Sequence, residues 1–159
     1  QSRHFAPHFH IPLQSGSNEV LSIMKRRYTR ELFAERVNHI KAVMPHAFIG
    51  VDCMVGVRGE TQEYWEDYLL FIKELDVSQL HVFTYSERAN TRMLDMDLYV
   101  VPKSERQRRS KILHAVSEEL WESKKEGNQM AGFTDNYIKV YCDYDKSKIN
   151  TFEVINSCR

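Results

Sequence analysis

Residues 47–61 decide the fold; they read Ala-Phe-Ile-Gly-Val-Asp-Cys-Met-Val-Gly-Val-Arg-Gly-Glu-Thr. Residues 47–55 form a mostly apolar run of strand length, which is typical of a parallel strand buried on both faces. Gly56 and Gly59 interrupt this run and predict a tight loop. Thr61 can then cap a helix. The apolar face of that helix comprises Trp65, Tyr68, Leu69, Ile72 and Leu75.

Two further strands are expected on either side of this stretch, at residues 8–13 and 79–85. Ser17 can cap a helix near 18–27, and Thr29 can cap a second helix that ends at Pro45. The apolar face of the second helix comprises Phe33, Val37, Ile40 and Met44. Strands that alternate with helices at intervals of roughly 30–40 residues predict an α/β fold with parallel pairing. Three strands leave exposed edges, so we expect a fragment whose sheet is completed by further residues or by self-association.

The pattern changes in the C-terminal part of the chain. Residues 86–102 look irregular, and residues 103–118 predict a helix that buries Ile112, Leu113 and Val116. From about residue 120, where Leu120-Trp-Glu-Ser favours a strand, short alternating segments such as 137–142 predict a small antiparallel β module. The sequence therefore predicts two parts, residues 1–119 and 120–159.

The composition is that of an ordinary globular protein. Among its 159 residues, 22 Lys and Arg balance 22 Asp and Glu, which argues against a bulk binder of polyanions. No apolar stretch approaches the roughly 20 residues that a membrane span needs. The three cysteines, Cys53, Cys142 and Cys158, are odd in number and widely spaced, so reduced thiols in the cytoplasm are expected.

Polar and glycine-rich residues follow each expected strand of the α/β part. Gln14-Ser-Gly-Ser17 suits the hydroxyl groups of a ribose, but it could equally be a turn that only caps a helix. The loop of Gly56 and Gly59 lets a ligand approach the backbone, or serves turn geometry alone. Residues 85–91 offer an aromatic ring, a hydroxyl and a guanidinium for a nucleotide, or form an incidental exposed loop.

Three other patterns allow two interpretations each. His8 and His10 share one face of a strand and could bind a metal with Asp52 and His81, but a hydrogen-bonding role is favoured. The basic start of the helix over 103–118 could contact phosphates, but a solvated charged face is more usual. The basic and aromatic side chains on one face of the β module, which suit a nucleic acid, are Tyr137, Lys139 and Tyr141.

Several segments together resemble the radical-SAM tRNA methylthiotransferases. They are residues 10–17 with 24–29, residues 51–61, and residues 83–91, in the family's order and spacing. Residues 130–142 are similar to the family's TRAM module, a small β fold associated with RNA binding. The Arg of Gly-Val-Arg-Gly-Glu-Thr, where Phe-Pro is commoner, and the segment from His81 to Arg88 are most similar to the threonylcarbamoyladenosine branch.

The resemblance implies the C-terminal half of a radical-SAM partial (β/α) barrel followed by a TRAM-like module. It implies an enzyme that uses S-adenosylmethionine (SAM) and two [4Fe–4S] clusters to add a methylthio group at C2 of a modified adenosine beside the tRNA anticodon. The cluster cysteine motifs have no match in this chain, so the chain alone is expected to be inactive. Alternatives are a non-catalytic RNA-binding module and an enzyme acting on isopentenyladenosine in tRNA.

By the same resemblance, particular residues are expected to bind ligands. The residues assigned to SAM are Gln14, Ser15, Val55, Gly56, Phe83 and Tyr85. The residues assigned to the substrate or to tRNA are Ser86, Arg88, Tyr137 and Lys139. No residue of this chain is assigned to catalysis or to a metal.

Overall fold

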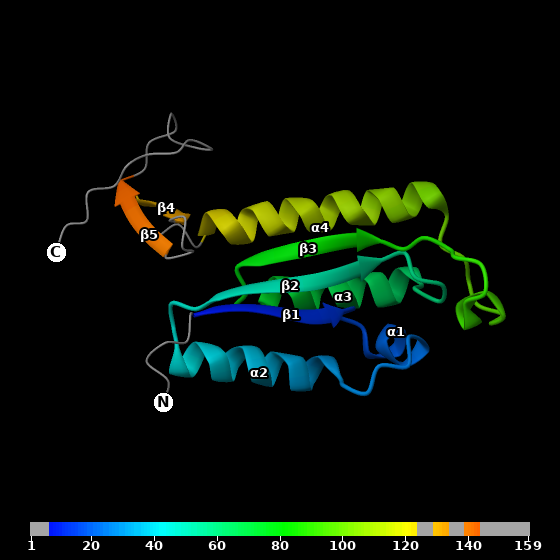
Figure 1. Ribbon diagram of the computed structural model, residues 1–159. Helices are drawn as coiled ribbons and strands as arrows, with labels where there is room; N and C mark the ends of the chain where they lie inside the picture. The colour runs from blue at the N-terminus through cyan, green and yellow to red at the C-terminus, as the bar shows by residue number, and fades with distance from the viewer. Residues whose placement is uncertain (1–6, 124–128, 134–138, 144–159) are drawn as a thin grey trace. The chain divides into compact units, whose positions relative to one another are not determined.

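The computed structural model describes residues 7–123, 129–133 and 139–143. The chain divides into two compact units, residues 1–121 and 122–159, and each is described by itself. Figure 1 shows the elements of both units, labelled in chain order.

The first unit is built around a parallel three-stranded sheet in the order β1-β2-β3. Its strands are β1 (His8–Gln14), β2 (Phe48–Val55) and β3 (Gln79–Thr84). Its helices are α1 (Asn18–Ile23), α2 (Arg30–Val43), α3 (Gln62–Glu74) and α4 (Lys103–Ser123). The predicted alternation of strands and helices with parallel pairing is therefore confirmed.

The three predicted helix caps are also confirmed. The side-chain oxygens of Ser17, Thr29 and Thr61 accept backbone N–H groups at the starts of α1, α2 and α3. The expected end of the first helix at residue 27 is wrong, because α1 ends at Ile23. Lys25 has a positive φ of 54°, and a residue in this left-handed conformation cannot continue an α-helix.

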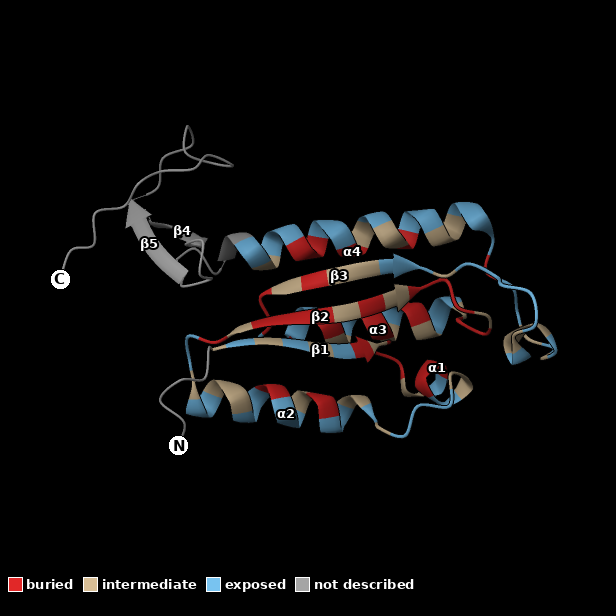
Figure 2. Cartoon of the chain, viewed as in Figure 1, coloured by how far each residue is buried: buried red, intermediate tan, exposed pale blue. Residues whose placement is uncertain are grey.

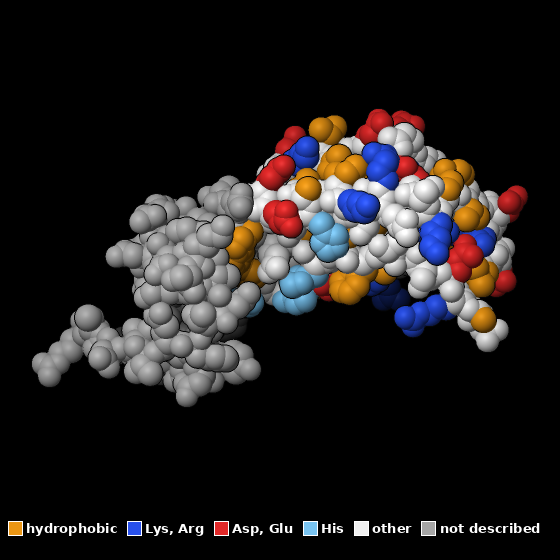
Figure 3. Space-filling model, turned by 90° about the horizontal axis from the view of Figure 1, so that it is seen from above, with side chains coloured by type: hydrophobic (Ala, Val, Ile, Leu, Met, Phe, Trp, Pro, Cys, Tyr) orange, Lys and Arg blue, Asp and Glu red, His pale blue; other side chains and the backbone are white. Residues whose placement is uncertain are grey.

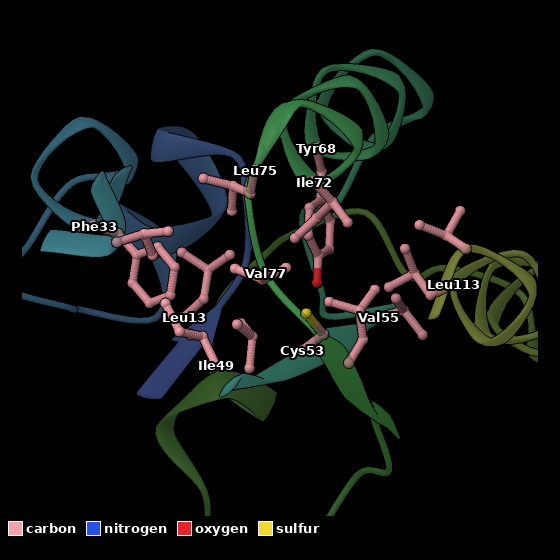
Figure 4. Close-up of a cluster of buried hydrophobic side chains, with 14 of the residues drawn as sticks. Leu13, Phe33, Ile49, Cys53, Val55, Tyr68, Ile72, Leu75, Val77 and Leu113 are labelled. Carbon is pink, nitrogen blue, oxygen red and sulfur yellow. The ribbon is translucent and has the colours of Figure 1, made fainter. Parts of the chain in front are cut away.

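The core lies between the sheet and the helices. Figure 4 shows side chains of Leu13, Ile49, Cys53 and Val55 from the strands facing side chains of α2, α3 and α4. Trp65, Tyr68 and Ile72 of α3 are almost fully buried, as is Leu113 of α4, which agrees with the predicted apolar faces. Figure 2 shows that buried residues line the inner sides of the helices, whose outer sides are exposed.

The opposite face of the sheet is more open than the sequence predicts. Along β1 the exposed residues His8, His10 and Pro12 alternate with less exposed ones. In β2, Asp52 and Met54 are half-buried, whereas Val51, Cys53 and Val55 are fully buried. The expectation that β2 is buried on both faces is therefore wrong within the described residues, because helices cover one face only.

The segment between β3 and α4 is irregular, as predicted, apart from a short 3₁₀ helix η1 (Arg92–Leu94). Helix α4 continues to Ser123, so Leu120 and Trp121 are helical and the strand expected there is wrong. Val116 and Ser117 of α4 are buried, and Leu120 packs against the same core cluster, so the packed face of the helix continues past its expected end at residue 118.

The described part of the second unit contains one antiparallel strand pair. The strands are β4 (Gln129–Phe133) and β5 (Lys139–Asp143), in register from Gln129 opposite Asp143 to Phe133 opposite Lys139. Among the described residues, no helix is both long and apolar enough to cross a membrane. In Figure 3, acidic and basic side chains are interspersed on the visible face of the first unit, in keeping with a net charge of zero.

Candidate functional site at the carboxyl edge of the sheet

The carboxyl ends of the three strands bring most of the predicted SAM residues to one edge. Gln14 at the end of β1 pairs in register with Cys53 of β2. The Tyr85 backbone N–H donates to the Val55 carbonyl at 2.9 Å, just beyond the ends of β2 and β3. Phe83 pairs in register with Met54. Ligands of open parallel sheets bind at this edge, so the predicted residues are brought together where binding is expected.

Gln14 and Ser15, the two predicted SAM residues at the end of β1, differ in burial and in hydrogen bonding. Gln14 is half-buried and has a positive φ of 71°, which marks a constrained backbone position. Ser15 is fully buried, and its Oγ accepts the Ser17 backbone N–H at 3.2 Å. The Ser15 hydroxyl thus holds the turn together, whereas no hydrogen bond within the described residues involves the Gln14 side chain.

The loop after β2 is held by a buried carboxylate. The Glu60 side chain has no exposed surface, and its Oε1 accepts the Gly56 backbone N–H at 3.0 Å. Gly56 has a φ of 78°, and a Cβ added there would lie 2.3 Å from Cγ of Arg106. Glycine is therefore required at this position by both backbone conformation and space.

Arg109 of α4 neutralises this carboxylate. Its Nη1 lies 2.6 Å from Glu60 Oε1 and also donates to the Glu60 carbonyl at 3.0 Å. The guanidinium also lies over the Trp65 ring, 5.4 Å from its centroid. Glu60 Oε2 is buried and has no hydrogen-bond partner among the described residues. Burial raises the pKa of Glu60, and the hydrogen bond from Arg109 opposes that shift.

The basic start of α4 is only in part the solvated charged face that the sequence favoured, because Lys103, Arg108 and Lys111 are exposed but Arg109 is buried. Arg109 is 1% exposed, so it belongs neither to a solvated face nor to a surface for phosphates. Arg108 instead pairs with Glu105 at 2.7 Å. Sequence reasoning missed Glu60 and Arg109 as a pair, although an arginine in register with the buried face of α4, four residues before Leu113, was a usable signal.

The segment after β3 carries exposed and charged residues. Phe83 is 52% exposed, and Ser86 and Arg88 are exposed as well. The Arg106 guanidinium lies over the Tyr85 ring, 5.4 Å from its centroid, and donates to the Tyr85 carbonyl at 3.2 Å. An exposed aromatic ring beside a glycine-containing loop suits a flat heterocycle such as adenine.

Comparison with known proteins assigns the residues that form this edge to a protein family. Residues 3–72 match the family model of the radical SAM superfamily. The chain contains part of a radical SAM domain. The α/β fold, the parallel sheet and the predicted resemblance agree with this assignment.

The relatives of this radical SAM domain are tRNA methylthiotransferases. The chain is 40% identical over 152 residues to the threonylcarbamoyladenosine tRNA methylthiotransferase MtaB of Bacillus subtilis, which covers 84% of this chain and 34% of the relative. It is 37% identical over 145 residues to the protein of the same name from Aquifex aeolicus, covering 85% and 35%. It is 40% identical over 120 residues to the tRNA-2-methylthio-N(6)-dimethylallyladenosine synthase of Streptomyces viridosporus, covering 75% and 24%. The chain thus spans about a third or less of the length of these relatives.

The residues at this edge of the sheet fit SAM, whereas the buried cysteine does not fit an iron–sulfur cluster. Gln14, the Gly56 loop and the exposed Phe83 ring offer polar and aromatic groups that fit SAM. Cys53 does not fit an iron–sulfur cluster, because it is fully buried and burial raises the pKa of its thiol to about 12. Figure 4 shows the Tyr68 hydroxyl pointing toward the Cys53 sulfur inside the core. Within the described ranges, no group of three or more His, Cys, Asp and Glu residues could hold a metal ion.

The histidines on the open face of the sheet make one hydrogen bond to Asp52 and two ring-stacking contacts. His10 Nε2 lies 2.5 Å from Asp52 Oδ1, and the rings of His10 and His81 stack with centroids 4.7 Å apart. His8 stacks on Phe48 instead, 4.5 Å between centroids. The favoured hydrogen-bonding interpretation is thus confirmed for His10, and the rings of His8 and His10 have different partners.

Two of the residues predicted to bind RNA belong to the second unit, Lys139 and Tyr137. Lys139 is the first residue of β5. Tyr137 lies outside the described residues. Their assignment to tRNA therefore stays a prediction.

Proposed function

We propose that the chain is part of a radical-SAM enzyme that adds a methylthio group to C2 of threonylcarbamoyladenosine next to the anticodon of tRNA. The observation that carries the proposal is the identity of 40% over 152 residues to a protein named for this activity. It extends through α4 and beyond the radical SAM match at residues 3–72. A cytoplasmic location follows from tRNA as the substrate.

In this proposal the edge of the sheet binds SAM. When bound, SAM would supply both the methyl group and the 5′-deoxyadenosyl radical. Gln14 would hydrogen-bond to a hydroxyl of the ribose, and Val55 and Gly56 would let the adenine approach the backbone. Phe83 and Tyr85 would flank the same pocket, since both lie at the end of β3. The two [4Fe–4S] clusters would be held by residues other than those described here.

The second unit would contact the RNA. Two antiparallel strands, β4 and β5, are compatible with a TRAM-like module. Lys139 and Tyr137 would contact tRNA from this module, and Ser86 and Arg88 would contact the substrate or SAM at the sheet edge. Residues 1–119 and 120–159 are the corresponding parts of the chain in this proposal.

The proposal is tested by mass spectrometry of tRNA nucleosides from a host with and without the complete gene that contains this chain. Loss of the methylthio form of threonylcarbamoyladenosine on deletion supports the proposal. Loss of the methylthio form of isopentenyladenosine contradicts the substrate but not the chemistry. No change in any tRNA nucleoside favours the alternative of a non-catalytic RNA-binding module.

The SAM site is tested by substitution in the same complete protein. Gln14→Ala is expected to weaken SAM binding about tenfold by calorimetry, because it removes hydrogen bonds to a bound ligand. Ser15→Ala is expected to act indirectly, through the turn that its hydroxyl holds. Unchanged SAM affinity in Gln14→Ala would remove this residue from the site.

A further inference from the structure

Two arginines from different elements converge on one carboxylate at the edge of the sheet. Arg58, in the loop after β2, donates from Nε to Oε1 of Glu87 at 2.9 Å. Arg106 of α4 places Nη2 3.6 Å from the same oxygen. The hydrogen bond from Arg58 is the main cause that lowers the pKa of Glu87, so this carboxylate is ionised near neutral pH.

The two arginines differ in how many of their donors are already used. Arg106 donates to the carbonyls of Val101 and Tyr85 and lies over the Tyr85 ring. Within the described part of the chain, the Arg58 guanidinium hydrogen-bonds to Glu87 alone and does so through Nε. A guanidinium has five N–H donors, so the terminal N–H groups of Arg58 remain available for a second acceptor.

Arg58 also lies in the right part of the fold to meet a substrate. It follows Gly56 by two residues in the loop that we assign to SAM, and its ion pair joins this loop to the segment after β3. The side chain is 17% exposed, so a ligand that binds there meets a partly desolvated cation. In such surroundings a charge-assisted hydrogen bond is stronger than one in open solvent.

The relatives act on two adenosine derivatives whose difference is a charge. Their names specify a threonylcarbamoyl group in one case and a dimethylallyl group in the other. A threonyl group joined through its amino nitrogen keeps a free carboxylate, whereas a dimethylallyl group is a hydrocarbon. A site that pairs a buried polar group with its substrate rejects an analogue that lacks the partner, because the group is then left unpaired. Arginine suits this task, since its planar donors match a carboxylate.

We infer that Arg58 recognises the carboxylate of the threonylcarbamoyl group and so determines the choice of substrate. Glu87 is the positioning residue, because it holds Nε and leaves the terminal N–H groups of Arg58 free for the ligand. This inference rests on the proposed function and deepens it by naming the residue that separates the two adenosine derivatives.

The experiment uses the complete protein that contains this chain and three anticodon stem-loop RNAs. The first carries threonylcarbamoyladenosine, the second its carboxylate methyl ester, and the third dimethylallyladenosine. The variants are Arg58→Gln, Arg58→Lys and the matched control Arg36→Gln, an exposed arginine on the outer side of α2. The measurements are the Kd of each RNA by fluorescence anisotropy, kcat/KM for methylthiolation, and the Kd of SAM.

Esterification of the RNA and the Arg58→Gln substitution should remove the same contact, that between Arg58 and the carboxylate. In the unsubstituted protein, esterification should weaken binding and lower kcat/KM at least about tenfold, because it removes the charge that Arg58 contacts. Arg58→Gln should cause a similar loss with the carboxylate RNA and little further loss with the ester. Arg58→Lys should restore part of the affinity for the carboxylate RNA only. Arg36→Gln should behave as the unsubstituted protein, and SAM affinity should be unchanged throughout.

Some outcomes would contradict the role of Arg58 alone, and others would contradict the proposed function as well. Suppose that the unsubstituted protein modifies the carboxylate RNA. If Arg58→Gln then weakens the binding of the carboxylate RNA and of its ester equally, or weakens the binding of SAM, Arg58 has a structural role and the inference alone fails. If the carboxylate RNA and its ester are equivalent, no residue recognises the charge. If the unsubstituted protein prefers the dimethylallyl RNA or modifies none of the three, the proposed function itself fails.

Discussion

Glu60 and Arg109 form an ion pair inside the protein, with 2.6 Å between Oε1 and Nη1 and at most 1% of either side chain exposed. The pair joins the loop after β2 to α4, because the same carboxylate oxygen also accepts the Gly56 N–H. One buried contact therefore fixes both the glycine turn and the helix that packs against it. The pair thus supports the sheet edge from inside the protein, away from solvent.

Breaking this pair from the arginine side should destabilise the fold. Arg109→Met removes the cation, also loses the contact with the Trp65 ring, and leaves Glu60 buried without its charge partner. Loss of one partner from a buried pair typically costs about 3–5 kcal/mol. The free energy of unfolding, measured by urea denaturation, should fall by about that amount.

Two further variants distinguish the cost of an unpaired buried charge from the cost of losing the Arg109 side chain. Glu60→Gln combined with Arg109→Met should recover part of the lost stability, because no unpaired charge then remains in the interior. Arg108→Met removes an exposed pair with Glu105 and should cost less than about 1 kcal/mol. Equal losses in the Arg108 and Arg109 variants would show that the burial of Arg109 contributes nothing.

Glu105 should make stability depend on pH in the acidic range. Its hydrogen bonds with Arg108, and then with Arg109, lower its pKa from 4.5 to about 2. Since the folded state binds this proton less readily than the unfolded state, the contribution is full above about pH 4.5 and is lost as the pH falls toward 2. Glu105→Gln should thus be less stable than the unsubstituted chain by roughly 1 kcal/mol at pH 7, because the pair is partly exposed.

The measurement is urea denaturation of both chains at several pH values between 7 and 3. The difference in free energy of unfolding should narrow once the pH falls below about 4.5. Glu118→Gln, an exposed change on the same helix, controls for the loss of one negative charge. A difference that stays constant over this range would contradict the assigned role of Glu105.

Gly56 should not tolerate a side chain. Gly56→Ala places an L-residue at a φ of 78° and brings its Cβ within 2.3 Å of Arg106 Cγ. The backbone strain and the displaced helix side chain together should cost about 2 kcal/mol or more in urea denaturation. Gly50→Ala is the matched control, since the nearest atom is the movable His81 ring nitrogen at 3.1 Å. Equal tolerance of both alanines would contradict the tight contact between the loop and α4.

The helix caps and the edge residues show what could be predicted from the sequence. Ser17, Thr29 and Thr61 act on backbone groups three residues away, so their roles depend on local order alone. Gln14 and Tyr85 come to the same edge because Gln14 ends β1, Tyr85 follows β3 and the strands are parallel. Local patterns with a fixed spacing are sufficient for such predictions.

The ion pairs show what could not be predicted from the sequence. Arg109 and Glu60 are 49 positions apart, and Arg58 and Glu87 are 29 apart. Which arginine of a basic run meets which carboxylate depends on how α4 rotates against the sheet, and spacing does not determine that rotation. The same limit explains Leu120, where a strand was expected, because this side chain packs against the core as part of α4.

Ser117 should stabilise the junction of α4 with β3. Its Oγ accepts the Leu80 backbone N–H at 2.9 Å and donates to the Leu80 carbonyl at 3.3 Å. Within the described sheet, β3 pairs with β2 alone, so the hydroxyl provides hydrogen bonds on the side where a further strand would lie. Ser117→Ala leaves both buried backbone groups unsatisfied and should cost about 1–3 kcal/mol in urea denaturation. The Leu80 amide should also exchange its hydrogen faster, whereas half-buried Ser110→Ala on the same helix should change neither measurement appreciably. Unchanged protection of Leu80 in Ser117→Ala would mean that this strand edge needs no cover from α4.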